Sequence, residues 1–222
     1  MKRIAFYGGS FDPVHSGHTT IAAKLIDIFG LDQFVFIPAF HAPHKPGRKP
    51  TSAFHRYAML CLATRGEDKL KVSKMELDLP DKPYTVETLE RLKLELLDDK
   101  VFFVMGADSW QDIRTWREWE KVLSMSDHIV VTRPGFEIDF SHVTAEIRDR
   151  IVDLRNKDFE TAKVEINSVI AGVDHRIYIT DAVEMDISAT DIRKAIRNGT
   201  TGWQGYMPDD VAKYIEKYQI YK

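Results

Sequence analysis

The hydrophobic positions of this chain alternate between short continuous runs and longer stretches with helical spacing. Continuous apolar runs predict strands at 4–7, 33–38, 70–73, 101–105, 127–132 and 176–180. Helical spacing and capping residues predict helices at 19–29, 53–64, 85–97, 143–154, 190–197 and 209–218. Residues 164–173 follow neither pattern. Because strands and helices alternate, the chain predicts an α/β fold with parallel strands joined by right-handed crossovers.

We expect this fold to be a Rossmann-like, doubly wound parallel sheet with a small C-terminal helical portion. A length of 222 residues fits one domain with a sizeable core. Within this single domain of residues 1–222, residues 1–180 should form the core and residues 181–222 a helical segment. The irregular part at 136–175 is expected to elaborate the same domain.

The strongest chemical signal lies between the first predicted strand and the first predicted helix, from Gly8 to His18. Gly8 and Gly9 let a ligand approach the backbone closely. His15 and His18 are three residues apart, so they share a face of the first helical turn. Backbone N–H groups and two imidazoles at a helix N-terminus suit a polyphosphate. The spacing matches neither the Walker pattern nor G-x-G-x-x-G.

A loop rich in proline and basic residues follows the second predicted strand, at 39–51. It is either a solvated surface loop or a basic flap over phosphates, since ligands of α/β sheets bind beyond the carboxyl ends of the strands. A metal site is a third reading, in which His41 and His44 would join His15 and His18. Because no cysteine accompanies these histidines, the metal site is the weaker alternative.

The strand predicted at 101–105 is apolar throughout, as is typical of a strand buried on both faces. It ends in Gly106 and Asp108, which places a carboxylate at the carboxyl edge of the sheet. Three tryptophans follow within ten residues, at Trp110, Trp116 and Trp119. Such residues pack in cores more often than they bind ligands, although one of them could stack on a heteroaromatic ring.

Composition excludes several classes of function. The chain is 44% hydrophobic and 29% charged, as an ordinary globular protein is. Its net charge of −3 argues against binding to nucleic acid or to an anionic membrane. The single cysteine, Cys61, cannot form an internal disulfide and is expected to pack in a core. We see no signal peptide and no apolar run near the ~20 residues that span a bilayer, so we expect a cytoplasmic protein.

Two blocks of sequence carry a family resemblance. Residues Gly8 to His18 resemble the G-G-[ST]-F-D-P-x-H-x-G-H signature of the H-x-G-H nucleotidyltransferase superfamily, and Ile187 to Arg193 resemble its I-S-x-T-x-I-R motif. Ala189 stands where that motif frequently has serine. Further blocks narrow the resemblance to the bacterial nicotinate-mononucleotide adenylyltransferases: Pro43-His44-Lys45, Tyr84 to Leu89, Gly106 to Ser109, Thr115-Trp116 and Arg133-Pro134-Gly135.

This resemblance implies that the protein transfers AMP from ATP to nicotinate mononucleotide, giving deamido-NAD and pyrophosphate. It implies four catalytic residues, His15, His18, Lys45 and Arg193. It implies ATP contacts from Gly8, Gly9, Ser10, Phe11, His15, His18, Lys45, Asp108, Ile187, Ser188, Thr190 and Arg193. It implies mononucleotide contacts from Tyr84, Thr85, Gly106, Asp108, Trp116 and Arg133. Mg²⁺ would arrive with ATP and need no dedicated protein ligand, with Asp108 as a candidate ligand.

The implied chemistry agrees with the residue types. The attacking 5′-phosphate oxygen is already anionic, so the reaction needs no general base and no covalent intermediate, only positioning and neutralised charge. Two alternatives stay open: another superfamily member that acts on phosphopantetheine or, with CTP, on a phosphoalcohol, and a nucleotide-sensing module without activity. We expect ATP and nicotinate mononucleotide as partners, no nucleic acid or membrane, and a monomer or small homo-oligomer.

Overall fold

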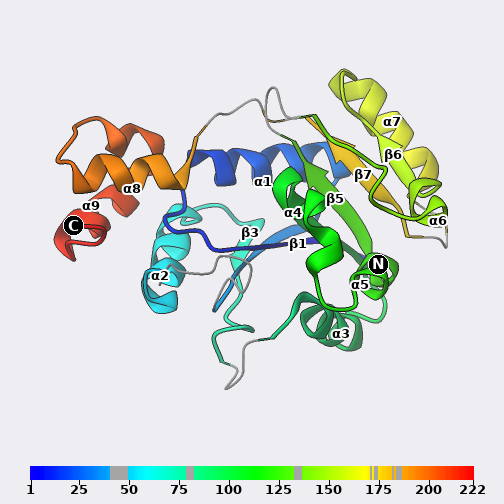
Figure 1. The fold of residues 1–222 in the computed structure, drawn as a ribbon, viewed down its shortest axis with the longest axis horizontal. Helices are drawn as coiled ribbons and strands as arrows, with labels where there is room; N and C mark the ends of the chain where they lie inside the picture. Colours follow the sequence, from blue (N-terminus) through cyan, green and yellow to red (C-terminus); the bar gives the residue numbers. More distant parts are fainter. Residues whose placement is uncertain are drawn as a thin grey trace.

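The computed structural model describes residues 1–40, 50–78, 83–132, 137–170, 172, 175–181, 183 and 187–222. A seven-stranded sheet with the order β3-β2-β1-β4-β5-β7-β6 forms its centre (Figure 1). All of its paired strands are parallel. The strands are β1 (Arg3–Gly9), β2 (Gln33–Pro38), β3 (Leu70–Val72), β4 (Lys100–Gly106), β5 (Asp127–Val131), β6 (Ile151–Asp153) and β7 (Ile177–Thr180). The predicted α/β class and parallel pairing are confirmed.

Helices cover both faces of this sheet, as in a doubly wound fold. They are α1 (Ser16–Phe29), α2 (Ala53–Ala63), α3 (Thr85–Glu95), α4 (Ala107–Gln111), α5 (Trp119–Met125), α6 (Ala145–Arg148), α7 (Phe159–Val169), α8 (Ala189–Arg197) and α9 (Asp209–Lys217), with 3-10 turns η1 (Ile113–Thr115) and η2 (Trp203–Tyr206). One hydrophobic core joins α1, α2, α7, α8 and α9 to the sheet. A second joins α3, α4, α5 and α6 to the other face.

The strand β4 shows why its sequence is apolar throughout. Phe102 and Val104 belong to the core under α1, whereas Phe103 and Met105 belong to the core under α3 and α5. Successive side chains of a strand point to opposite faces, so a strand covered on both sides needs apolar residues at every position.

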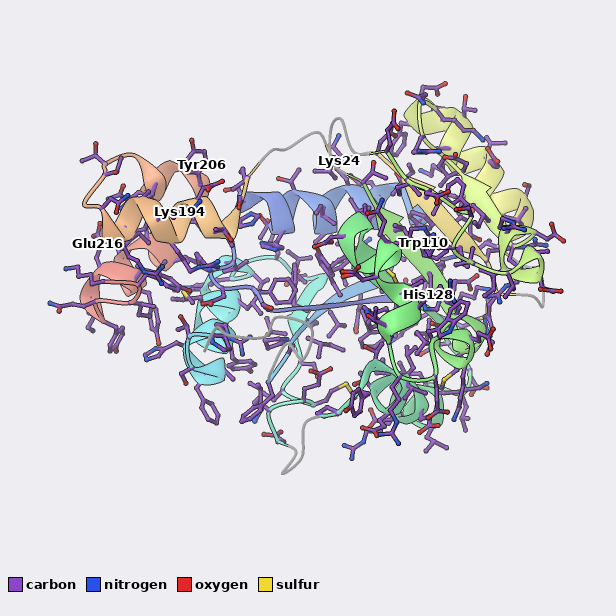
Figure 2. All side chains as sticks on the ribbon, viewed as in Figure 1. Lys24, Trp110, His128, Lys194, Tyr206 and Glu216 are labelled. Atoms are coloured by element: carbon purple, nitrogen blue, oxygen red, sulfur yellow. The ribbon has the colours of Figure 1, made fainter. Side chains whose placement is uncertain are left out.

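The C-terminal segment packs against the same face as α1 and α2. Ile192, Trp203 and Val211 are buried in the core that also contains residues of α1 and α2. In Figure 1 this segment, in orange and red, lies at the end of the molecule where α1 begins. Figure 2 labels three of its polar side chains, Lys194, Tyr206 and Glu216. We propose that the whole chain forms one domain, as the sequence led us to expect.

Two predictions for the region before β7 were wrong. The helix predicted at 143–154 is the short helix α6 followed by β6, a three-residue strand at the edge of the sheet. Residues 164–173 were expected to be irregular, yet helix α7 runs from Phe159 to Val169. Two sequence features favour this helix. Asp158 is its N-cap and accepts the N–H of Thr161 at 3.0 Å, and Ala162 and Ile166, four residues apart, are both buried.

The prediction for Cys61 was also wrong, because Cys61 is exposed. It lies on the outer side of α2, whose buried face carries Met59 and Leu60. Within the described part of the chain, no helix has the length and apolar character that crossing a membrane requires.

Candidate active site

A cavity of about 540 Å³ opens at the carboxyl ends of β1 and β4, the neighbouring strands at the centre of the sheet. From β1 the chain winds outward through β2 and β3, and from β4 it winds outward the other way through β5. This reversal is the place where doubly wound sheets bind ligands. The described residues with predicted ligand roles line the cavity: Gly8, Gly9, Ser10, Phe11, His15, His18, Tyr84, Thr85, Gly106, Asp108, Trp116, Ile187, Ser188, Thr190 and Arg193.

Two candidate residues, Lys45 and Arg133, lie outside the described residues. The histidines His41 and His44 of the alternative metal site lie outside them as well. Their roles therefore stay predictions from the sequence.

The turn after β1 is built around the ring of Phe11. A Cβ atom at position 9 would lie 2.8 Å from Phe11 Cζ, so Gly9 leaves room for that ring. Phe11 itself has a φ of 47°, in the left-handed region that most residues avoid. Its ring packs edge-on against Tyr7 and His18, with centroid distances of 5.3 and 5.0 Å. Phe11 therefore fixes the turn and supports one imidazole, besides any contact with a nucleotide.

The two histidines form a compact pair at the start of α1. His15 is the N-cap, and its backbone N–H donates to His18 Nδ1 at 3.2 Å. The two ring centroids are 3.8 Å apart. Because Nδ1 of His18 accepts a hydrogen bond, the proton of the neutral ring resides on Nε2, which makes Nε2 a donor. The predicted shared face is therefore present, and the H-x-G-H spacing has a geometric reason: a Cβ at Gly17 would lie 3.0 Å from the His15 ring.

A second helix N-terminus reaches the cavity from the far end of the chain. Ser188 caps α8, and its Oγ accepts the N–H of Thr190 at 3.2 Å. Arg193, one turn further along, is buried and donates to Thr190 Oγ1 at 2.8 Å and to the backbone carbonyl of Asp12. The N-terminal and C-terminal motifs thus meet across one cavity, although 181 residues separate Asp12 and Arg193.

Asp12 has a positioning role that the sequence did not reveal. Its Oδ1 accepts a hydrogen bond from Tyr221 Oη at 2.7 Å, and its Oδ2 accepts the N–H of Thr51 at 3.4 Å. Burial, followed by the nearby carboxylate of Asp12, raises the pKa of Tyr221, which therefore stays a donor. Three distant segments are joined at Asp12, and no local sequence signal marks such a junction.

Arg56 is a second positioning residue that the sequence did not reveal. It is 1% exposed and donates to the carbonyls of Ser10 at 2.6 Å, Ala39 at 2.6 Å and Thr51 at 2.9 Å. The segments that follow β1 and β2 are therefore held together by one guanidinium, whose fork of donors suits several carbonyls at once.

The opposite half of the cavity is aromatic. Tyr84 is the N-cap of α3, and its N–H donates to Glu87 Oε2 at 3.0 Å. Trp116 is half-buried and packs edge-on against Phe103 at a centroid distance of 6.4 Å. The other two tryptophans of the segment 110–119 are structural, as expected. Trp110 is fully buried in the core under α3 and α5, and Trp119 packs against that core.

The edge of β4 completes this half. A Cβ at Gly106 would lie 2.6 Å from Asp108 Oδ1, so glycine allows the carboxylate to fold back over the strand end. Arg117 also lines the cavity, with its guanidinium carbon 5.0 Å from the Tyr84 ring centroid and an ion pair to Glu87 at 3.3 Å. Among the described residues, no group of three or more histidine, cysteine, aspartate or glutamate side chains could hold a metal ion.

The fold is a doubly wound α/β fold, and its cavity lies beside the N-termini of α1 and α8. The family model described as cytidylyltransferase-like matches residues 6–195. A protein of Desulfatibacillum aliphaticivorans, named as a probable nicotinate-nucleotide adenylyltransferase, is 35% identical over 99% of both chains. One of Corynebacterium jeikeium with the same name is 32% identical over 96% of this chain and 98% of its own. The chain belongs to the cytidylyltransferase-like family and, within it, to the nicotinate-nucleotide adenylyltransferases.

Solved structures give the same fold. The nicotinic acid mononucleotide adenylyltransferase of Plasmodium falciparum, complexed with APC, has a TM-score of 0.73 and 20% identity over all of this chain and 98% of its own. The same protein complexed with NaAD has a TM-score of 0.72. At this level of identity the likeness concerns the fold, and it confirms the expected Rossmann-like architecture.

Proposed function

We propose that this protein transfers the AMP group of ATP to nicotinate mononucleotide, giving deamido-NAD and pyrophosphate. The observation that carries the proposal is one cavity with two chemically different halves. One half has two helix N-termini, a histidine pair and a buried arginine, which suit a polyphosphate. The other half has Trp116 and the start of α3, which suit a pyridine ring with a carboxylate.

In the phosphate half, His18 Nε2 and Arg193 would share the charge that builds on the α-phosphate and the departing pyrophosphate. The backbone from Gly8 to Phe11 would follow the nucleotide, held in its turn by Arg56. His15 would act beside His18, because the two rings are in contact. The family resemblance implies that Lys45 would bind the same phosphates.

In the aromatic half, Trp116 would stack on the pyridine ring. The N–H groups of Tyr84 and Thr85 are expected to bind its carboxylate, as free N–H groups at a helix start favour anions. Since the Tyr84 N–H donates to Glu87 in this structure, it would have to exchange that partner. Thr85 is the first residue of α3, and its N–H would bind the carboxylate together with that of Tyr84.

We propose Mg²⁺ as the divalent cation. ATP phosphates supply most of its oxygen ligands, so the ion would arrive with the substrate and need few protein ligands. Bound there, Mg²⁺ would supply positive charge at the reacting phosphates. Asp108 is an exposed carboxylate on the cavity wall and could contribute one oxygen.

We propose the cytoplasm as the site of action, because ATP is a cytoplasmic substrate.

The test is the release of pyrophosphate from ATP and Mg²⁺ with three acceptors in turn. We expect the highest kcat/KM with nicotinate mononucleotide, a lower one with nicotinamide mononucleotide, and no turnover with phosphopantetheine. Turnover with phosphopantetheine alone would overturn the proposal, and so would ATP binding without turnover of any acceptor, since a nucleotide sensor would behave in that way.

A further inference from the structure

A carboxyl group that the proposed reaction does not use lies in the wall of the cavity. Glu76 follows β3, and its Oε1 accepts a hydrogen bond from Thr88 Oγ1 at 3.1 Å. The backbone N–H of Phe40 also donates to this carboxyl group. Thr88 lies in the first turn of α3, three residues after Thr85. Glu76 therefore stands beside the helix start that is expected to bind the carboxylate of the pyridine ring.

No cation of the described chain forms an ion pair with Glu76. Arg56 is the cation that acts on it electrostatically, but its guanidinium donates to backbone carbonyls. The other charged or titratable side chains on the described wall come from β1, α1, α4, α8 and the segments that join these and neighbouring elements: Tyr7, Asp12, His15, His18, Tyr84, Asp108, Asp112, Arg117 and Arg193. Arg117 pairs with Glu87 and Glu118, and Arg193 with the Asp12 carbonyl and Thr190.

The charge of Glu76 changes in the physiological pH range. Removal from water raises its pKa to about 7, although the hydrogen bonds from Thr88 and Phe40 and the charge of Arg56 oppose the shift. At pH 6 the group is mostly neutral, and at pH 8 it is mostly ionised. An ionised Glu76 puts negative charge close to the place where an anionic substituent must bind.

We propose that Glu76 sets the preference of the site for the acid mononucleotide over the amide, favouring the acid when its carboxyl group is neutral. This inference rests on the proposed function. The two substrates share ribose, phosphate and pyridinium, and differ where one has a carboxylate and the other an uncharged carboxamide. One added negative charge on the wall of the same cavity repels only the carboxylate. At a separation of about 12 Å and an effective dielectric constant of about 20, the resulting change in preference is about tenfold.

The experiment compares the two mononucleotides from pH 6.0 to 8.5 at saturating ATP. We would measure kcat/KM for each mononucleotide and take the ratio of the two values. Titration of the substrate phosphate, the ATP and the active-site histidines affects both values alike, so it cancels in their ratio. In the wild type we expect the preference for the acid to fall about tenfold with a midpoint near pH 7. In Glu76→Gln, which keeps an acceptor for Thr88, we expect no pH dependence.

Two further variants separate charge from structure. Thr88→Val removes a hydroxyl that stabilises the ionised carboxyl group, so the midpoint should move to higher pH. Glu90→Gln changes an exposed carboxylate on α3 that pairs with Lys121, and it should keep the wild-type curve. A purely structural role for Glu76 would leave the midpoint unchanged in Thr88→Val.

The inference would be overturned if the wild-type preference for the acid did not change with pH, or if this preference fell equally in Glu76→Gln. Either result would leave the proposed function intact. If nicotinate mononucleotide is not turned over at pH 6.0 or at pH 8.5, the proposed function itself fails, and this inference fails with it.

Discussion

Replacing Tyr221 by phenylalanine tests whether the second-last residue of the chain holds the candidate site together. Tyr221 Oη donates to Asp12 Oδ1 at 2.7 Å, and both side chains are 8% exposed. The substitution keeps the ring and removes the hydrogen bond to the Asp12 carboxylate, together with the hydrogen bond between Tyr221 and the Thr51 side chain. A hydrogen bond to a charged group contributes about 1.5–3 kcal/mol, and among the described residues the carboxylate left behind keeps the Thr51 N–H at 3.4 Å.

We therefore expect the free energy of unfolding to fall by about 1.5–3 kcal/mol. For a chain of this length, each kcal/mol lowers Tm by about 2–4 °C. Urea unfolding at pH 7.5 measures the first quantity and a thermal melt the second. The matched control is Tyr206→Phe in the same C-terminal segment, where the side chain is 50% exposed and the change should stay within about 0.5 kcal/mol (Figure 2).

The same substitution, Tyr221→Phe, should also lower the catalytic activity. The backbone carbonyl of Asp12 accepts a hydrogen bond from Arg193, so a displaced Asp12 moves the arginine that is expected at the phosphates. We expect kcat/KM for ATP to fall in Tyr221→Phe, with normal values in Tyr206→Phe. If Tyr221→Phe were no less stable than Tyr206→Phe, Asp12 would not depend on this bond and the reasoning would be refuted.

Three further substitutions test the cavity. His18→Ala should lower kcat by about 10²–10³-fold in steady-state assays of the folded variant, as expected for the loss of one charge-stabilising donor; a near-normal kcat would contradict its role. Gly17→Ala should keep or raise Tm, since alanine favours a helix, while lowering kcat by displacing the His15 ring; unchanged kcat would show that the ring has room. Trp116→Ala should raise KM for the mononucleotide more than for ATP, and equal effects would exclude ring stacking.

The parts of the site that were predictable from the sequence depend on local rules. The glycine turn, the histidine pair and the Ser188 cap each follow from residues within four positions of one another. These interactions join residues that are close in sequence at a helix start, so they require a characteristic spacing of residue types. The prediction that the two motifs lie at one site has another basis, because it came from the family resemblance and not from any periodicity.

The parts that were missed depend on tertiary contacts. The partner of Asp12 lies 209 residues away at Tyr221, and Arg56 reaches Ser10 over 46 residues. An arginine in an amphipathic helix ordinarily faces solvent, and only the folded structure reveals that Arg56 faces inward.

Histidines show both cases. Of the eight in the sequence, His15 is marked by its local spacing to His18, whereas no local signal showed that His128 is buried in β5 (Figure 2). Burial lowers the pKa of His128 to about 3, so it is a neutral core residue.

The charged groups of this cavity divide into those that bind the backbone and those available to a ligand. Arg56 donates hydrogen bonds to the carbonyls of Ser10 and Ala39, which follow β1 and β2. In this way Arg56 fixes the turn that contains Gly8 to Phe11. Arg193 donates to the Asp12 carbonyl and also lines the cavity, so it connects the fixed turn to the cavity wall. A phosphate transfer without a general base depends on donors that are already in position when charge develops. Arg56 and Arg193 are buried cations that hold backbone segments in place, and in this way they keep such donors in position.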